Sequence, residues 1–146
     1  MIHRHGKGRP GDFHEGKWNG LGGKCELDES FANAARRELK EESGLEPEAS
    51  AFRCLGFLQF PNFKPHKSED WICAVYRVEL PRQLRDQVRA ESVEGSLRWI
   101  PMPEVTQLAL WPGDRKFIPY VLKGQAFAGT FWYRDGELIR SEVSAI

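Results

Sequence analysis

The sequence has no excess of charge of either sign. Lysine plus arginine and aspartate plus glutamate each number 21, so the formal net charge is zero. Proteins that hold long nucleic acids need a basic surface that neutralises the phosphates. The charge balance therefore argues against long nucleic acid as a partner, although it leaves a single nucleotide open as a ligand.

Long apolar segments and cysteine pairs are also scarce. No apolar run approaches the roughly 18 residues that indicate a membrane span, and the chain does not open with a signal-peptide pattern. The cysteines are Cys25, Cys54 and Cys73, an odd number without the spacing of a metal site. We therefore expect a soluble, cytoplasmic protein with reduced thiols and no membrane partner.

What the 146 residues do contain is an alternation of strand and helix patterns, without repeats or linkers, which predicts one α/β domain over residues 1–146. The first helix is expected to begin near Asp28 to Ser30 and to end at Gly44, a typical C-terminal glycine. The second runs over residues 114–123, with Pro119 close to its first turn. The predicted inward side chains are Phe31, Ala34, Ala35 and Leu39 in the first helix, and Phe117, Tyr120 and Val121 in the second.

Strands are predicted from alternating runs and from runs of aromatic and β-branched residues. Asp135-Gly136 separates two such runs and indicates a type I′ hairpin turn. A polar loop is expected over residues 61–70, Pro81 should stop the strand before it, and residues 81–92 fit a short helix or a loop. The remaining strands are predicted at residues 1–5, 18–21, 52–60, 71–80 and 97–100, with a helical turn at 103–108.

Three carboxylates share one face of the first predicted helix. Glu38, Glu41 and Glu42 stand at positions i, i+3 and i+4, where like charges repel and destabilise a bare helix. A hard divalent cation would offset that repulsion, and Mg²⁺ binds a few carboxylates together with substrate phosphates. The alternative is a solvated acidic face.

A wider pattern encloses these glutamates. It consists of Gly23, Glu29, the run Arg37-Glu38-Leu39, then Glu41-Glu42 and Gly44-Leu45. Every fixed position of the Nudix box is filled at the correct spacing, so the chain resembles the Nudix hydrolases. The resemblance implies an α/β/α sandwich with a mixed sheet. Relatives carry more of a strand before the residues that match 1–5, so we expect a truncated first strand. Either the given start lies downstream of the true one, or the sheet has an unpaired inner edge that is offset by dimer contacts or by lower stability; monomer and homodimer both remain open.

Nudix enzymes split a nucleoside diphosphate that is linked to another group. The resemblance implies that Mg²⁺, or Mn²⁺ in its place, neutralises the phosphates and activates a water. The implied ligands are Glu38, Glu41, Glu42, the carbonyl of Gly22, and Glu94, with Glu91 as the alternative to Glu94. The general base remains open among these glutamates. Arg37 is counted with the catalytic positions, while Gly23, Glu29 and Gly44 are structural positions of the motif, and Glu29 is expected to pair with Arg37.

Substrate contacts are expected outside the box. Arg4 and Lys24 are candidates for phosphate binding, with solvated surface cations as the alternative. The run from Lys17 to Lys24 (KWNGLGGK) is similar to the MutT-like branch, whose members hydrolyse oxidised purine nucleoside triphosphates. By that resemblance, Asn19 reads the purine edge, Phe13 lines the base pocket and Trp111 stacks on the base. Phe60 is either a pocket wall or a core residue.

The sequence departs from the branch after Trp111. Mammalian relatives have two adjacent aspartates after Trp-Pro, whereas this chain has Gly113 and Asp114. Asp114 therefore reads the base alone or caps the helix that follows. We expect a nucleoside triphosphate pyrophosphohydrolase that forms the monophosphate and pyrophosphate, with 8-oxo-dGTP as a sanitised substrate. The alternatives are a broader hydrolase of canonical dNTPs, dinucleoside polyphosphates or nucleotide sugars, and a catalytically silent nucleotide sensor.

Overall fold

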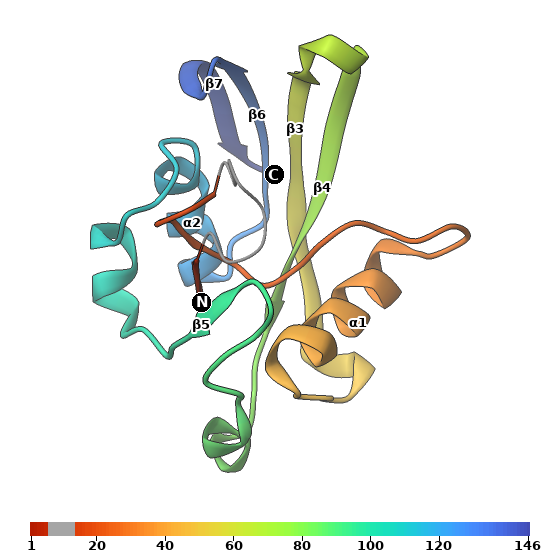
Figure 1. Ribbon diagram of the computed structural model, residues 1–146, viewed down its shortest axis with the longest axis vertical. Coiled ribbons are helices and arrows are strands. Elements are labelled where there is room, and N and C mark those ends of the chain that lie inside the picture. The colour runs from red at the N-terminus through yellow and green to blue at the C-terminus, as the bar shows by residue number, and fades with distance from the viewer. Residues whose placement is uncertain (6–13) are drawn as a thin grey trace. The chain divides into compact units, whose positions relative to one another are not determined.

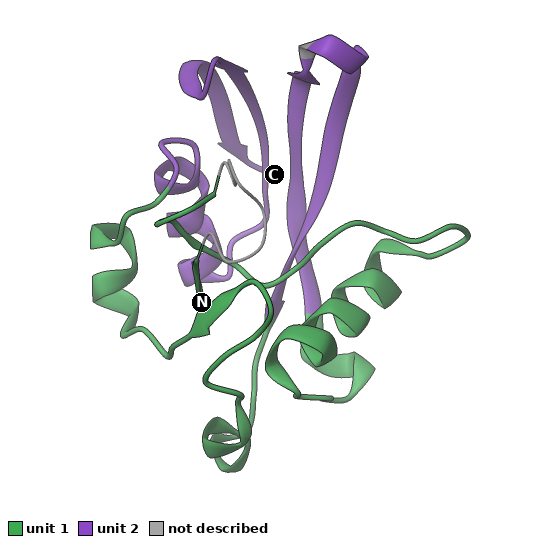
Figure 2. Cartoon of the chain, in the orientation of Figure 1, with its two compact units in different colours: residues 1–52, 78–110 green, residues 53–77, 111–146 purple. Residues whose placement is uncertain are grey.

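The computed structural model describes residues 1–5 and 14–146 (Figure 1). These residues form two compact units, each assembled from two stretches of the chain (Figure 2). Unit 1 contains residues 1–52 and 78–110, and unit 2 contains residues 53–77 and 111–146. The chain thus enters each unit twice. None of the helices in the described residues is long and apolar enough to cross a membrane.

Unit 1 contains a small antiparallel sheet with the strand order β2-β1-β5. Its strands are β1 (Ile2–Arg4), β2 (Trp18–Asn19) and β5 (Gly95–Leu97). Ile2 lies opposite both Asn19 and Leu97 and is 1% exposed, so the short first strand is central and its first residue is buried. Within the described residues this strand is paired on both sides, which contradicts the expected unpaired inner edge. The strand predicted at residues 97–100 is misplaced, because the pairing with β1 ends at Leu97.

Helix α1 (Phe31–Ser43) is the long helix of unit 1. The Ser30 hydroxyl accepts the N–H of Asn33 at 3.2 Å, so Ser30 is the N-cap and the helix begins where the sequence predicted, near Asp28 to Ser30. Gly44 has a φ of +77° and ends the helix in the left-handed conformation, as predicted. Of the predicted apolar face, Ala34 is buried, whereas Phe31 is 43% exposed because it occupies the first helical position.

Short 3₁₀ helices complete the secondary structure of unit 1. They are η1 (Ala49–Ala51), η3 (Arg82–Gln87) and η4 (Met102–Gln107). For residues 81–92 the sequence fitted a short helix or a loop, and η3 shows that this segment contains a short helix. The third confirms the helical turn predicted at 103–108.

Unit 2 is built on a mixed sheet with the strand order β4-β3-β6-β7. Its strands are β3 (Phe52–Lys64), β4 (Glu69–Val78), β6 (Phe127–Arg134) and β7 (Glu137–Ala145). β3 runs parallel to β6, and β6 is antiparallel to β7. The tight connection of β6 to β7 has a φ of +50° at Asp135 and +85° at Gly136, as predicted for the hairpin turn.

The polar loop predicted at residues 61–70 is wrong. β3 continues to Lys64 and is joined to β4 by the 3₁₀ helix η2 (Pro65–Lys67). The rings of Phe63 and Trp71 lie 5.0 Å apart across the two strands, a contact that extends the ladder beyond the apolar run. β4 also ends at Val78, earlier than the predicted stop at Pro81.

The core of unit 2 lies between this sheet and helix α2 (Asp114–Lys123), whose bounds match the prediction. Leu55, Leu58, Phe127 and Phe131 form the buried cluster, and the predicted inward residues Phe117, Tyr120 and Val121 pack against it. Pro119 lies inside the helix, past its first turn, which corrects its predicted position.

Candidate active site

Helix α1 carries the three predicted carboxylates in unequal surroundings. Glu42 is 7% exposed, whereas the side chains of Glu38 and Glu41 are 16% and 59% exposed. The backbone N–H of Gly22 donates to Glu42 Oε2 at 2.8 Å. The helix therefore holds one buried carboxylate beside two more accessible ones.

Burial raises the pKa of Glu42 to about 7, because a charged carboxylate loses hydration there. The negative charges of Glu38 and Glu41 raise it further. The Gly22 N–H and the guanidinium of Arg4 act in the opposite direction. The acidic face thus contains a carboxylate whose negative charge the protein only partly compensates.

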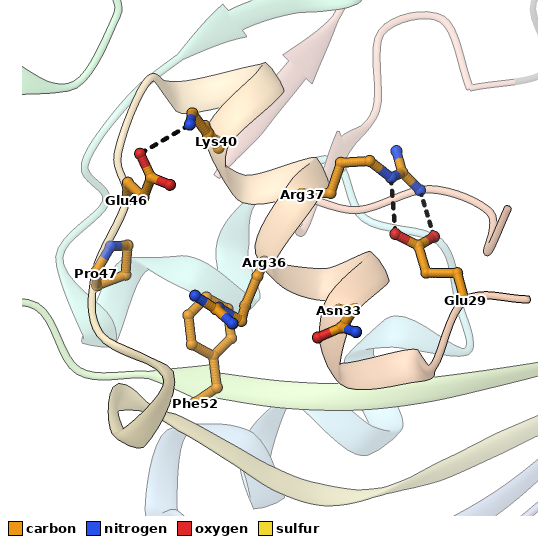
Figure 3. Close-up of a pocket in the computed structure, with 8 residues that line it drawn as sticks. All are labelled: Glu29, Asn33, Arg36, Arg37, Lys40, Glu46, Pro47 and Phe52. Atoms are coloured by element: carbon orange, nitrogen blue, oxygen red, sulfur yellow. Dashed lines mark hydrogen bonds and ion pairs between the residues drawn. The ribbon is translucent and has the colours of Figure 1, made fainter.

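Arg37 fastens the preceding loop to this helix. Its Nε and Nη2 donate to the two carboxylate oxygens of Glu29 at 3.0 and 2.9 Å, which confirms the predicted pair (Figure 3). Nη2 also donates to the carbonyl of Lys24 at 2.9 Å, and Nη1 donates to Glu38 at 2.9 Å and to Glu41 at 3.4 Å. These hydrogen bonds lower the pKa of Glu29 and raise that of Arg37. One guanidinium therefore sets the position of the loop and of two glutamates.

Gly23 is required by its contact with the acidic face. A Cβ atom at this position would lie 2.3 Å from Oε1 of Glu38. Such a side chain would push the carboxylate away from the loop, so the glycine at this motif position keeps loop and helix in contact.

Arg4, at the end of β1, and Glu94, directly before β5, form an ion pair with each other. Arg4 lies opposite Gly95 in the pairing of β1 with β5, which brings Glu94 to the same edge. The sequence assigned these two residues to different ligands, phosphate for Arg4 and metal for Glu94. Glu91, the alternative to Glu94, accepts a hydrogen bond from the Ser96 hydroxyl at 2.8 Å.

The predicted metal ligands are not gathered into one cluster. Within residues 1–5 and 14–146, no three histidine, cysteine, aspartate or glutamate side chains converge as a metal site requires. The carboxylates of Glu38, Glu41 and Glu42 instead bind Arg37 and the Gly22 N–H, and Glu94 binds Arg4. Their chemistry nevertheless fits a hard divalent cation, since all donors are oxygens and the buried Glu42 lacks a full counter-charge.

A cavity of 280 Å³ lies against another side of α1 (Figure 3). Its polar wall includes Asn33, Arg36 and Lys40, and Lys40 is paired with Glu46 at 2.8 Å. None of the three glutamates of the acidic face lines it. The cavity meets the candidate site only through the Glu29–Arg37 pair.

The residues predicted to read the base are divided between the two units. Asn19, on β2 of unit 1, has a buried Nδ2 that makes no hydrogen bond within the described part of the chain. Trp111 and Asp114 belong to unit 2, and Phe13 lies outside the described residues. Phe60 packs on the unit 2 core, with its ring 5.7 Å from that of Phe131, which agrees with the core alternative.

The turn from Trp111 to Asp114 leads into α2. The N-cap of this helix is Gly113, which has no side chain to cap it, and Asp114 is not the N-cap, so its alternative role as the helix cap is wrong. Asp114 is the first helical residue, and burial raises its pKa to about 6. Its carboxyl group is therefore not explained by helix capping.

Tyr133 is a polar side chain at this turn that the sequence did not single out. The N–H of Gly113 donates to its hydroxyl at 2.9 Å. The alternation of β6 contained a usable signal, because Phe127, Phe131 and Tyr133 are separated by even numbers of residues and thus share one face of the strand.

Comparison with known proteins identifies the family. The NUDIX domain matches residues 1–121. The chain is 29% identical over 132 residues to the oxidized purine nucleoside triphosphate hydrolase of Mus musculus, covering 88% of this chain and 78% of that protein. It is 30% identical over 127 residues to the protein of the same name from Danio rerio, covering 87% and 76%.

A solved structure agrees with these relatives. The MutT protein from Bacillus halodurans matches with a TM-score of 0.70 and 27% identity, over 87% of this chain and 82% of that one. The chain belongs to the Nudix family and has its α/β fold. Within the family it is a MutT-like hydrolase, so the alternative of a catalytically silent sensor is set aside.

Proposed function

We propose that this protein is a metal-dependent pyrophosphohydrolase that cleaves a nucleoside triphosphate to the monophosphate and pyrophosphate. The observation that carries the proposal is the complete Nudix helix, with the buried Glu42 beside Glu38 and Glu41. Oxidised purine deoxynucleotides such as 8-oxo-dGTP are the first candidate substrates, supported by the mouse and zebrafish relatives, which are oxidized purine nucleoside triphosphate hydrolases. The reaction would remove damaged nucleotides from the cytoplasmic pool.

Bound Mg²⁺ or Mn²⁺ would neutralise phosphate charge and lower the pKa of a water. Glu38, Glu41 and Glu42 supply the oxygen donors for such an ion, and Glu94 would join them by parting from Arg4. The guanidinium of Arg4 would bind phosphate oxygens, for which its paired N–H groups are suited. Arg37 would keep its contacts with Glu29 and the loop.

The buried Nδ2 of Asn19 supports a role in base recognition. This donor has no hydrogen-bond partner among residues 1–5 and 14–146, and a ligand acceptor would satisfy it. The position of Trp111 before α2 supplies an aromatic face that would stack on any base.

A broader hydrolase of canonical dNTPs, dinucleoside polyphosphates or nucleotide sugars is the second candidate. A Cβ atom at Gly113 would lie 2.7 Å from the Tyr133 hydroxyl and 2.9 Å from the Phe131 ring, so the first carboxylate of the mammalian pattern would require these side chains to shift. The loss of that carboxylate favours a wider substrate range.

The test is hydrolysis of a nucleotide panel by purified protein with Mg²⁺, with product analysis. The panel contains 8-oxo-dGTP, dGTP, the other dNTPs, a dinucleoside tetraphosphate and a nucleotide sugar. We expect nucleoside monophosphate and pyrophosphate, with the largest kcat/KM on 8-oxo-dGTP. A larger kcat/KM on a canonical dNTP, a dinucleoside polyphosphate or a nucleotide sugar would favour the second candidate, and turnover of none would refute both.

A further inference from the structure

Tyr133 and the turn from Trp111 to Asp114 form one polar group in unit 2. The Tyr133 hydroxyl accepts the N–H of Gly113 at 2.9 Å. The rings of Trp111 and Tyr133 meet edge to face, with centroids 6.2 Å apart and an interplanar angle of 87°. The tyrosine thus holds the turn through its backbone and touches its aromatic residue.

The hydroxyl occupies the space that a side chain at position 113 would need. A Cβ atom on the buried Gly113 would lie 2.7 Å from this oxygen. The absence of a side chain at Gly113 therefore leaves room for the hydroxyl group of Tyr133. Where mammalian relatives carry the first of two carboxylates, this chain presents the phenol of Tyr133.

The hydroxyl still has a proton to donate. It accepts from Gly113, and it makes no other hydrogen bond within residues 1–5 and 14–146. Burial raises the pKa of Tyr133, and the charge of Asp114 raises it further, so the phenol remains protonated at neutral pH. A half-buried donor beside a carboxyl group is a pair that can read a base edge.

The purine edge that best matches this pair is that of a 2-amino-6-oxopurine. A carboxylate accepts hydrogen bonds through two oxygens, which suits the neighbouring N1–H and 2-amino donors. The O6 atom beside them is an acceptor and needs a donor. An adenine edge offers the carboxylate only its 6-amino group.

We propose that Tyr133 is a specificity-determining residue that donates its hydroxyl proton to O6 of a guanine-type base, while Asp114 accepts from N1–H and the 2-amino group. The phenol thus supplies a polar contact beside Gly113, the position at which the mammalian pattern has the other carboxylate. The inference rests on the proposed function only in taking a nucleotide as the ligand.

The test compares two ligands that differ in one atom. Calorimetry gives the dissociation constants of GMP and of 6-thio-GMP, whose sulfur is a weak acceptor, for the full chain and for Tyr133→Phe. We expect the substitution to weaken GMP about 3- to 10-fold, the range of one neutral hydrogen bond, and to change 6-thio-GMP less than about 2-fold. Unaltered protein should already bind 6-thio-GMP more weakly than GMP by a similar factor. Tyr120→Phe, which removes a hydroxyl from a ring packed on Phe127 of the same core, is the matched control and should change neither constant.

Equal weakening of both ligands by Tyr133→Phe would show that the tyrosine only supports the turn, and would overturn the inference. Unchanged GMP binding, or no GMP binding by unaltered protein, would overturn it as well. The wild-type ligand comparison does not depend on the variant's folding. Binding without turnover of any nucleotide would refute the proposed hydrolase and leave this inference standing, whereas turnover with unchanged base preference in Tyr133→Phe would refute the inference alone.

Discussion

Replacing Asp114 by asparagine should make the folded protein more stable at neutral pH. Asp114 is the first residue of α2, and its carboxyl group does not cap the helix. Burial raises its pKa from 3.8 to about 6. The folded state therefore holds this proton more tightly than the unfolded chain does, and ionisation at neutral pH works against folding.

The sign and size follow from proton linkage. Between pH 3.8 and about 6 the folded state binds more protons at Asp114 than the unfolded state does, so the free energy of unfolding falls as pH rises through this window. Each pKa unit corresponds to about 1.4 kcal/mol, which sets a ceiling of roughly 3 kcal/mol for this group. The favourable position of a negative charge in the first turn of a helix offsets part of that cost. We expect Asp114→Asn to gain about 1–2 kcal/mol at pH 8 relative to pH 4.

Urea denaturation of both proteins from pH 4 to pH 8 measures this difference. Contributions from other groups cancel when the two unfolding free energies are subtracted at each pH. Asp86→Asn, which neutralises an exposed carboxylate on η3, is the control and should give a nearly flat difference. A flat difference for Asp114→Asn as well, or one that falls between pH 4 and 6, would refute the reasoning.

Three further substitutions test other parts of the site. Glu42→Gln should lower kcat at saturating Mg²⁺ by at least about two orders of magnitude with the fold intact, since it removes a ligand charge from the acidic face; unchanged turnover would contradict the metal role. Asn19→Ala should alter kcat/KM ratios among bases while changing the urea midpoint little, because its buried Nδ2 has no hydrogen bond to lose among the described residues; an equal loss on all substrates would indicate a structural role. Arg89 donates through Nη1 to the carbonyl of Glu41 at 3.2 Å and through its backbone N–H to that of Ser43 at 3.0 Å. Arg89→Ala removes the side-chain contact and a cation at the C-terminus of α1, so it should lower the free energy of unfolding by about 1 kcal/mol in urea denaturation. The exposed Arg85→Ala is the control, and equal urea midpoints for the two variants would contradict the prediction.

The features that the sequence predicted correctly depend on residues close together in the chain. These features are the start of α1 near Asp28 to Ser30, the glycine at its end, the pair of Glu29 with Arg37 and the turn at residues 135–136, and each arises within about ten residues. Local hydrogen bonds and backbone preferences determine such features, so their sequence patterns are sufficient. The bounds of α2 were predicted for the same reason.

The features that were missed depend on contacts between distant residues. β3 extends past Phe60 because Phe63 meets Trp71 of the next strand, a contact that no period within β3 reveals. Arg4 and Glu94 were recognised as charged site residues, yet their mutual ion pair depends on the pairing of β1 with β5. A residue type can indicate chemistry, but the partner of a charged group is decided by the sheet register.

The turn at Gly113 shows that contacts between distant residues also bear on substrate specificity. In the sequence alone, the glycine replaces one carboxylate of the mammalian pattern, which favours a less selective enzyme. In the folded unit 2 the same position is filled by the hydroxyl of Tyr133, which comes from a strand 20 residues later. A comparison at residue 113 alone records a missing carboxylate, whereas the folded unit places the hydroxyl of Tyr133 beside this position. We therefore expect the base preference that we propose to follow the pair of residues 113 and 133 rather than residue 113 alone.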